Sequence, residues 1–184
     1  MAARHLPVNA ERDGNRPVVE TFSTVRLHAE RLSLHHAEYL AALHRDPAVM
    51  AMIGGTQSAE ESELWLRRNL EHWDDNGFGQ WMLRDATSQL VGRAGLRWID
   101  SSVCQHVVEV GHVLERSAWS AGLATEVTTG IIGIARDRYL MPELGAITLV
   151  GNDASRRVLT KCGFAFERTV AHPNGPHHFY RLNL

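Results

Sequence analysis

The stretch NDASRRVLTKCGF, which runs from Asn152 to Phe164, predicts a short helix followed at once by a strand. Asn152 or Asp153 is suited to cap the first turn, where the backbone N–H groups of a helix lack partners. Gly163 stands where many helices end on a left-handed residue. An Asn three residues before Ser155 and a Lys-x-Gly-Phe ending exceed what an ordinary helix needs, so the stretch indicates a function as well as a fold.

A second segment, VGHVLERSAWSAGLATE from Val110 to Glu126, predicts a strand, a loop of small residues and a long helix that begins near Gly122. The backbone N–H groups at such a helix start point outward and carry about half a positive charge. They suit an anion such as a pyrophosphate, and Gly122 lets the backbone approach it closely. On its own, the segment also fits a tight turn that binds nothing.

The rest of the chain alternates strand and helix patterns without an internal repeat. This order predicts a mixed α/β single domain in residues 21–184, preceded by a disordered leader in residues 1–20. A first strand is expected to start at 25–27, further strands are expected at 80–85, 90–98, 107–114, 146–150, 164–170 and 177–182, and helices are expected to open at Ser33, Asp46, Ser58, Gly122 and Asn152.

Composition narrows the function. The chain has 184 residues with 19 Lys and Arg against 21 Asp and Glu, so no basic excess calls for nucleic acid or an anionic membrane. The 2 cysteines, Cys104 and Cys162, are too few for a disulfide framework, and a reduced cytoplasmic protein is expected. The 11 histidines lack the spacing of metal ligands, so no metal site is predicted.

The two segments together resemble the GNAT superfamily of N-acetyltransferases, in its RimJ/RimL-type branch. The run WSAGLATE, Trp119 to Glu126, is similar to the branch's Trp-x-x-Gly-Tyr-Ala-Thr-Glu motif, and the stretch from Asn152 to Phe164 looks like its second acetyl-CoA motif. Supporting matches are Thr24–Leu27, Asp46–Met50 and the glycines of Leu90–Leu96. The resemblance covers residues 24–184.

The resemblance implies a mostly antiparallel central sheet with helices on both faces and a splayed strand pair, 107–114 and 146–150. The co-substrate acetyl-CoA would lie in the gap between these strands. The residues implied to bind it are Val113, Leu114, Ser120, Ala121, Gly122, Leu123, Ala124, Thr125, Asn152, Ser155 and Arg157. Ser120 and Ala121 precede the glycine where most family members have Arg or Gln, so phosphate binding is expected to rest on main-chain donors.

The implied activity is direct acetyl transfer to a primary amine. Glu109 is the candidate general base, Ser155 a candidate proton donor to the leaving thiolate, and a backbone N–H near Val113 the oxyanion donor. His112 lies on the opposite side of the strand from Glu109, and which of the two faces the substrate is left open. His172 is a further candidate.

The acceptor is left open between a protein N-terminus and a small amine, and a homodimer is one alternative for the assembly. Two rival functions remain: a sensor that binds acyl-CoA without turnover, and a structural domain that binds an anion. The aromatic residues of 65–98 fit either an acceptor cleft or the core.

Overall fold

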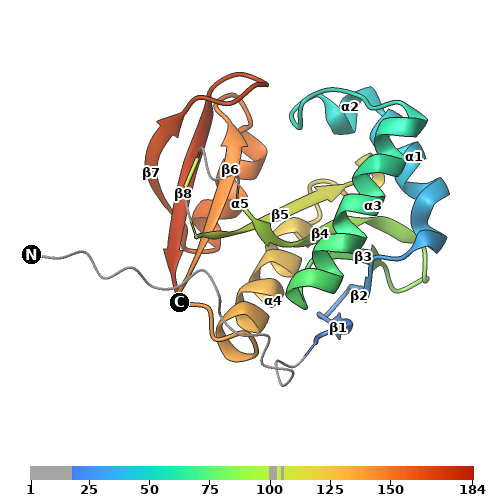
Figure 1. Cartoon of the computed structure of the whole chain (residues 1–184), viewed down its shortest axis with the longest axis horizontal. Helices are drawn as coiled ribbons and strands as arrows, with labels where there is room; N and C mark the ends of the chain where they lie inside the picture. The colour runs from blue at the N-terminus through green and yellow to red at the C-terminus, as the bar shows by residue number, and fades with distance from the viewer. Residues whose placement is uncertain (1–17, 100–102, 105) are drawn as a thin grey trace, which may run out of the picture.

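The computed structural model describes residues 18–99, 103–104 and 106–184, which form one mixed eight-stranded sheet (Figure 1). Its strand order is β1-β2-β3-β4-β5-β6-β8-β7, and every neighbouring pair is antiparallel except β5 with β6. The strands are β1 (Thr21–Ser23), β2 (His28–Arg31), β3 (Gln80–Arg84), β4 (Leu90–Trp98), β5 (Val108–Leu114), β6 (Glu143–Leu149), β7 (Ala165–Val170) and β8 (His177–Asn183).

Helices cover both faces of the sheet. They are α1 (Ala37–Arg45), α2 (Pro47–Met50), α3 (Ala59–Asn76), α4 (Leu123–Asp137) and α5 (Asp153–Lys161), with 3-10 turns η1 (Leu34–His36) and η2 (Arg116–Ala118). Alternate residues of a strand point to opposite faces, so β5 shows which helix lies where. Val113 packs with hydrophobic residues of α1 and α2, whereas His112 Nδ1 lies 3.3 Å from Thr128 Oγ1 of α4. The predicted fold class is confirmed.

Local capping signals were predictive because they act within one turn. Ser58 Oγ accepts from Glu61 N at 3.2 Å, Glu61 Oε2 accepts from Ser58 N at 2.7 Å, and α3 ends on Gly77 with φ +72°. At α5 the cap is Asn152, whose Oδ1 accepts from Ser155 N at 3.1 Å. The helix start at Ser58 and the Asn152 cap are therefore confirmed.

Two strand boundaries differ from the sequence prediction. Residues 25–27 form the turn between β1 and β2, because Thr24 N donates to Leu27 O at 2.8 Å and Ser23 pairs with His28. Strand β6 begins at Glu143, since pairing with β8 extends it beyond the apolar run. Residues 1–17 of the expected leader lie outside the described residues.

The aromatic residues divide between core and surface. Trp73, Trp81 and Phe78 are buried in the main hydrophobic cluster, while Trp98 is exposed. The core interpretation therefore holds for the first three.

None of the helices in the described ranges has the length and apolar character that a membrane span requires.

Candidate functional site

The sheet splays between its two central strands. Strands β5 and β6 are paired in parallel at a single position, Glu109 opposite Gly145, and they carry no further ladder pairs toward Leu114 and Leu149 (Figure 1). Every other neighbouring pair of strands is more extensively bonded. With only one paired position, β5 and β6 leave backbone groups facing an open gap between them. This is the splayed pair that the sequence predicted.

Hydrogen bonds at both ends of the β4–β5 ladder show which amides face that gap. Ile99 N donates to Val107 O and Glu115 N donates to Val91 O, both at 3.0 Å. In an antiparallel ladder, bonded positions alternate with unbonded ones. The odd-numbered residues of β5 are therefore bonded to β4, and the even-numbered residues direct their backbone groups toward β6.

This alternation separates the two residues that the sequence named as backbone contacts. The amide of Val113 points to β4, whereas the amides of His112 and Leu114 point into the gap. The carbonyl of Leu114 accepts from Trp119 Nε1 at 2.8 Å. The backbone donors that remain available near the end of β5 are therefore the N–H groups of His112 and Leu114, and not that of Val113.

The start of α4 presents main-chain donors of the kind that suit an anion. Gly122 caps the helix with φ +81°, and Ser120 in the preceding loop has φ +60°. The first intrahelical bond runs from Glu126 N to Gly122 O at 3.1 Å. The N–H groups of Leu123, Ala124 and Thr125 precede that bond and have no intrahelical acceptor. These donors fit a pyrophosphate.

A cation from a distant segment stands beside this loop. Arg26 Nη1 donates to Ala121 O at 2.8 Å, and Arg26 Nε donates to Glu126 Oε2 at 2.7 Å. Arg26 Nη2 lies 3.6 Å from the position that a Cβ on Gly122 would occupy. The sequence showed no cation within the loop itself. The family match of residues 24–27 was the available signal, but nothing in it indicated this contact.

Glu126 is held ionised by these neighbours. Partial burial raises the pKa of Glu126, but hydrogen bonds from Thr24 and Arg26 and the Arg26 charge outweigh it and lower the pKa below its usual value. Thr24 Oγ1 donates to Glu126 Oε1 at 2.5 Å. The carboxylate therefore fixes the β1–β2 turn against the first turn of α4.

The second motif segment lies next to the first. Helices α4 and α5 touch where Cys162 Sγ lies 3.7 Å from Thr125 O. Asn152 Oδ1 is used in the helix cap, so its amide nitrogen remains as a donor. The Ser155 hydroxyl makes no hydrogen bond to any described residue, and Arg157 is exposed. The two segments thus share one side of the fold, as the two-part motif requires.

Glu109 is a buried carboxylate at the point where the strands separate. Its side chain is 10% exposed, and Oε1 accepts from Arg97 Nε at 3.1 Å. Oε2 is buried and has no hydrogen-bond partner among the described residues. A buried polar atom without a partner is costly unless a ligand or water satisfies it. Glu109 therefore has a buried acceptor that no described residue satisfies.

His112 does not share the face of Glu109. It lies against α4 beside Thr128, and burial lowers its pKa to about 4, so the imidazole is neutral at physiological pH. Glu109 occupies the face that α1 and α2 cover. The sequence left open which of Glu109 and His112 faces the substrate, and the structure places the two side chains on opposite faces of the sheet. His172 lies in the β7–β8 loop, where its Nδ1 accepts from Asn174 N at 3.3 Å.

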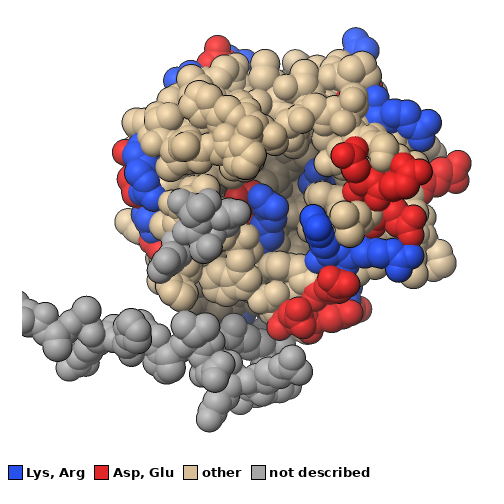
Figure 2. Space-filling view, turned by 45° about the horizontal axis from the view of Figure 1, so that its top comes forward, with Lys and Arg blue, Asp and Glu red and all other residues tan. Residues whose placement is uncertain are grey.

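Space for a ligand lies above Gly111, between Glu109 and Val113 on the same face. The only atom within 4 Å of an ideal Cβ on Gly111, its chain neighbours aside, is Glu109 Oε1 at 3.9 Å, so a methyl group there would meet no other described neighbour. Figure 2 shows this side of the molecule hollowed between the β6–β8 part and the helical α1–α3 part, with basic side chains near the rim.

Two loops meet across the molecule at the open end of the splay. A Cβ on Gly54, in the α2–α3 loop, would come within 2.4 Å of Asn174 Nδ2 at the tip of the β7–β8 hairpin. Figure 1 shows these two loops approaching each other above β5 and β6. The contact bounds the hollow from above.

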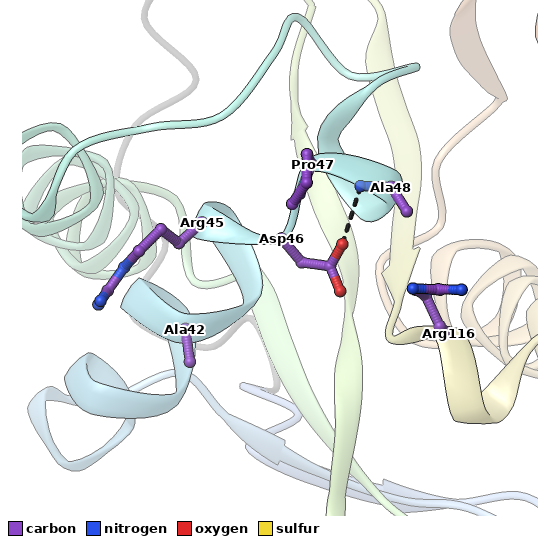
Figure 3. A pocket seen from close by; sticks show the side chains of 6 residues that line it. All are labelled: Ala42, Arg45, Asp46, Pro47, Ala48 and Arg116. Atoms are coloured by element: carbon purple, nitrogen blue, oxygen red, sulfur yellow. Dashed lines mark hydrogen bonds between the residues drawn. The ribbon is translucent and has the colours of Figure 1, made fainter.

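Two cavities lie away from Glu109. One, of about 480 Å³, is lined by Ala42, Arg45, Asp46, Pro47, Ala48 and Arg116. In Figure 3 Asp46 and Arg116 approach it from opposite sides, and Asp46 Oδ1 accepts from Ala48 N at 2.8 Å. The other, of about 190 Å³, lies near Asn76, Trp98 and Tyr139.

Among the residues described, no group of three or more His, Cys, Asp or Glu is placed to hold a metal ion.

Comparison with known proteins supports the family that the two sequence motifs resemble. The chain matches the acetyltransferase (GNAT) domain family over residues 26–165. It is 26% identical over 143 residues to the uncharacterized protein YkkB of Bacillus subtilis, covering 76% of this chain and 81% of that protein. It is 24% identical over 165 residues to the uncharacterized N-acetyltransferase YoaA of the same organism, covering 86% and 90%.

Solved structures with low sequence identity share the fold. An acetyltransferase from Agrobacterium tumefaciens superposes with a TM-score of 0.79 at 17% identity, covering 100% of each chain. RimL, a ribosomal L7/L12 alpha-N-protein acetyltransferase in complex with coenzyme A, gives 0.74 at 14%, covering 92% and 97%. Spermidine N-acetyltransferase from Vibrio cholerae, in complex with CoA and spermine, gives 0.70 at 14%, covering 85% and 95%. GNAT enzymes use acetyl-CoA as the acetyl donor. The family match spans most of the chain, and the protein is therefore a member of the GNAT family and an N-acetyltransferase.

Proposed function

We propose that the protein transfers an acetyl group from acetyl-CoA directly to a primary amine, with Glu109 as general base. The observation that carries this proposal is the position of Glu109 at the last paired residue of the splay, with a buried Oε2 that no described residue satisfies. In the reaction, the amine nitrogen forms a bond to the acetyl carbon and the carbon–sulfur bond breaks. The proton lost by the amine passes to Glu109, directly or through water.

The chain's own groups supply the remaining steps. The N–H groups of Leu123, Ala124 and Thr125 would bind the pyrophosphate, and Asn152 would bind the pantetheine arm from the α5 side. The N–H of His112 or Leu114 would stabilise the oxyanion that forms on the acetyl carbonyl. The unbonded Ser155 hydroxyl would donate a proton to the departing thiolate, and exposed Arg157 would attract the adenosine phosphates.

Membership of the RimJ/RimL-type branch, action in the cytoplasm and homodimer formation belong to the same proposal. The branch assignment is supported by the run from Trp119 to Glu126, and RimL shares the fold. RimL is named for a protein N-terminus and another structural relative for spermidine, so the relatives leave the acceptor class open.

The proposal is tested by release of the CoA thiol in the presence of a panel of amines, alongside calorimetry with acetyl-CoA. We expect acetyl-CoA binding and amine-dependent thiol release. Ser155→Ala is expected to lower kcat with little change in KM for acetyl-CoA. Binding without thiol release for any acceptor would instead favour a sensor that recognises acyl-CoA without turnover.

A further inference from the structure

Arg93 is a buried cation in the centre of the face that carries Glu109. Its residue surface is 8% exposed, and it is the only arginine that is buried in the described part of the chain. Its guanidinium lies 4.1 Å from the centre of the Trp65 ring of α3. On β4 it stands opposite Val113, while Arg97 stands opposite Glu109, so Arg93 and Glu109 share one face.

The side chains that Arg93 contacts directly are neutral. Arg93 Nε donates to His44 Nε2 at 3.3 Å, and Nη1 lies 3.5 Å from Gln80 Oε1. Burial, and secondarily the Arg93 charge, lowers the pKa of His44 to about 4, so this imidazole is uncharged. His44 Nδ1 in turn lies 2.9 Å from Ser62 Oγ. The Trp65 ring lies over the guanidinium, and Val113 is the register partner of Arg93 on β5.

Arg93 stays charged without a counter-ion. Burial, and secondarily repulsion by Arg97, lowers the pKa of Arg93 to about 9, which is still above neutral pH. Arg26, Arg84, Arg97 and Arg181 each contact a carboxylate, whereas Arg93 forms no ion pair with any described residue. A guanidinium has five N–H donors, and only two hydrogen bonds are made here.

Buried charges in proteins are normally paired, because an isolated ion is expensive to remove from water. A buried guanidinium with spare donors is therefore suited to an anionic ligand. The planar fork of arginine matches the two oxygens of a carboxylate. Gly95 and Gly111 lie between the level of Arg93 and that of Glu109, so β4 and β5 contribute no side chain there, and Gln80 of β3 lies beside Gly95.

We infer that the acceptor amine carries a carboxylate, and that Arg93 binds this carboxylate while Glu109 receives the proton of the amine. This inference rests on the proposed acetyl transfer and narrows its substrate class to an amino acid or short peptide. Arg93 and Glu109 are separated by four residues of sheet, roughly 13 Å of strand, which the long arginine side chain shortens. Polyamines and other purely cationic acceptors would meet an unfavourable charge.

The experiment compares matched acceptors on the full-length protein with acetyl-CoA. Each pair consists of an amino acid and the carboxamide of the same chain length, and rates are expressed per concentration of free amine. We expect wild-type protein to favour the carboxylate at least tenfold in kcat/KM and Arg93→Met to abolish this preference through KM. Arg84→Met, which removes an arginine already paired with Glu30, is the control and should retain the preference. Equal use of both acceptors by wild type, or an unchanged preference in Arg93→Met, would overturn the inference.

A second measurement is independent of turnover. Glutarate has no amine, so it tests carboxylate binding alone by calorimetry on the complex with CoA. Binding to wild type and not to Arg93→Met supports the inference even if no acceptor in the panel is acetylated. Efficient acetylation of neutral amines without glutarate binding would leave the proposed function standing and remove the inference. If Arg93→Met fails to fold, Arg93→Lys keeps the charge without the fork and should raise KM for the carboxylate acceptor.

Discussion

Arg26 and Glu126 lie 100 positions apart in the chain, yet the backbone N–H of Arg26 reaches Glu126 Oε1 at 2.8 Å and its Nε reaches Oε2 at 2.7 Å. The same guanidinium holds the carbonyl of Ala121. The β1–β2 turn is thereby tied to the loop that would receive the pyrophosphate. The geometry of this loop depends on a residue that no local pattern connects with it.

Replacing Arg26 with Ala is expected to weaken acetyl-CoA binding. The side chain is half exposed, so its hydrogen bonds and charge contribute about 1 kcal/mol, roughly a fivefold rise in the Kd of acetyl-CoA. Arg31→Ala serves as the control, because Arg31 forms surface ion pairs with Glu20 and Asp74 away from the loop. Calorimetry measures both variants, and equal affinities would contradict the role given to Arg26.

Gly122→Glu is expected to lower acetyl-CoA affinity by at least about tenfold, or 1.4 kcal/mol. The new carboxylate would stand beside the phosphates, and φ +81° is unfavourable for any residue with a Cβ. Gly133→Glu adds the same charge to the same helix at a position with no neighbour within 4 Å of its Cβ. If both variants bind acetyl-CoA like wild type, the start of α4 is not the phosphate site.

Glu109→Gln is expected to reduce kcat about a hundredfold at neutral pH, because the amine loses its proton acceptor. The loss should shrink toward high pH, where free amine is plentiful without a base. The pH–rate profile of wild type and variant measures this difference. Parallel profiles would show that Glu109 is not the base. His112 cannot substitute, since it lies on the α4 face.

Gly111→Leu is expected to raise KM for the acceptor at least tenfold while the Kd of acetyl-CoA stays unchanged. The leucine would extend into the space next to Glu109 Oε1, the only atom within 4 Å of a Cβ on Gly111 apart from its chain neighbours. Gly111→Ala is the graded control: at 3.9 Å its methyl group makes ordinary contact and should cost little. Initial rates at varied acceptor concentration separate KM from kcat, and an unaffected acceptor KM in the leucine variant would exclude this space as the acceptor site.

Stability should fall in mild acid because of His44. Its pKa is about 4 in the folded protein against 6.5 for an exposed imidazole, so the unfolded state binds more protons between these values. The contribution of His44 to the free energy of unfolding should therefore be constant above about pH 7 and decline from pH 6.5 toward 4, by up to about 3 kcal/mol. Urea denaturation at pH 7 and pH 5 measures the decline. His44→Gln should be less sensitive to pH across this window, and the same slope in both proteins would argue against a neutral buried His44.

The sequence was informative where structure is local. The helix start at Ser58 and the Asn152 cap each depend on residues within one turn. The two acetyl-CoA segments were recognisable because each is a contiguous motif. The strand–helix order then led to the correct fold class.

Contacts between segments that are distant in the sequence could not be predicted from local patterns. Residues 25–27 have a strand-like pattern but form a turn, because the pairing of β1 with β2 decides their conformation. Arg93 reads as an ordinary arginine in a strand until α1 brings His44 and α3 brings Trp65 against it. Strand periodicity shows only that Glu109 and His112 lie on opposite faces of β5. Which face each residue occupies becomes known only from the helices that cover the two faces.

The meeting of Gly54 with Asn174 has a consequence for the shape of an acceptor. Since the two loop tips approach each other, they narrow the approach to the hollow, and we expect an acceptor amine to reach Glu109 as the end of a slender chain. A free amino acid or the N-terminal end of a polypeptide would fit this approach better than a lysine on the flat surface of a folded protein. Steric access between the two loops would then select acceptors independently of their charge.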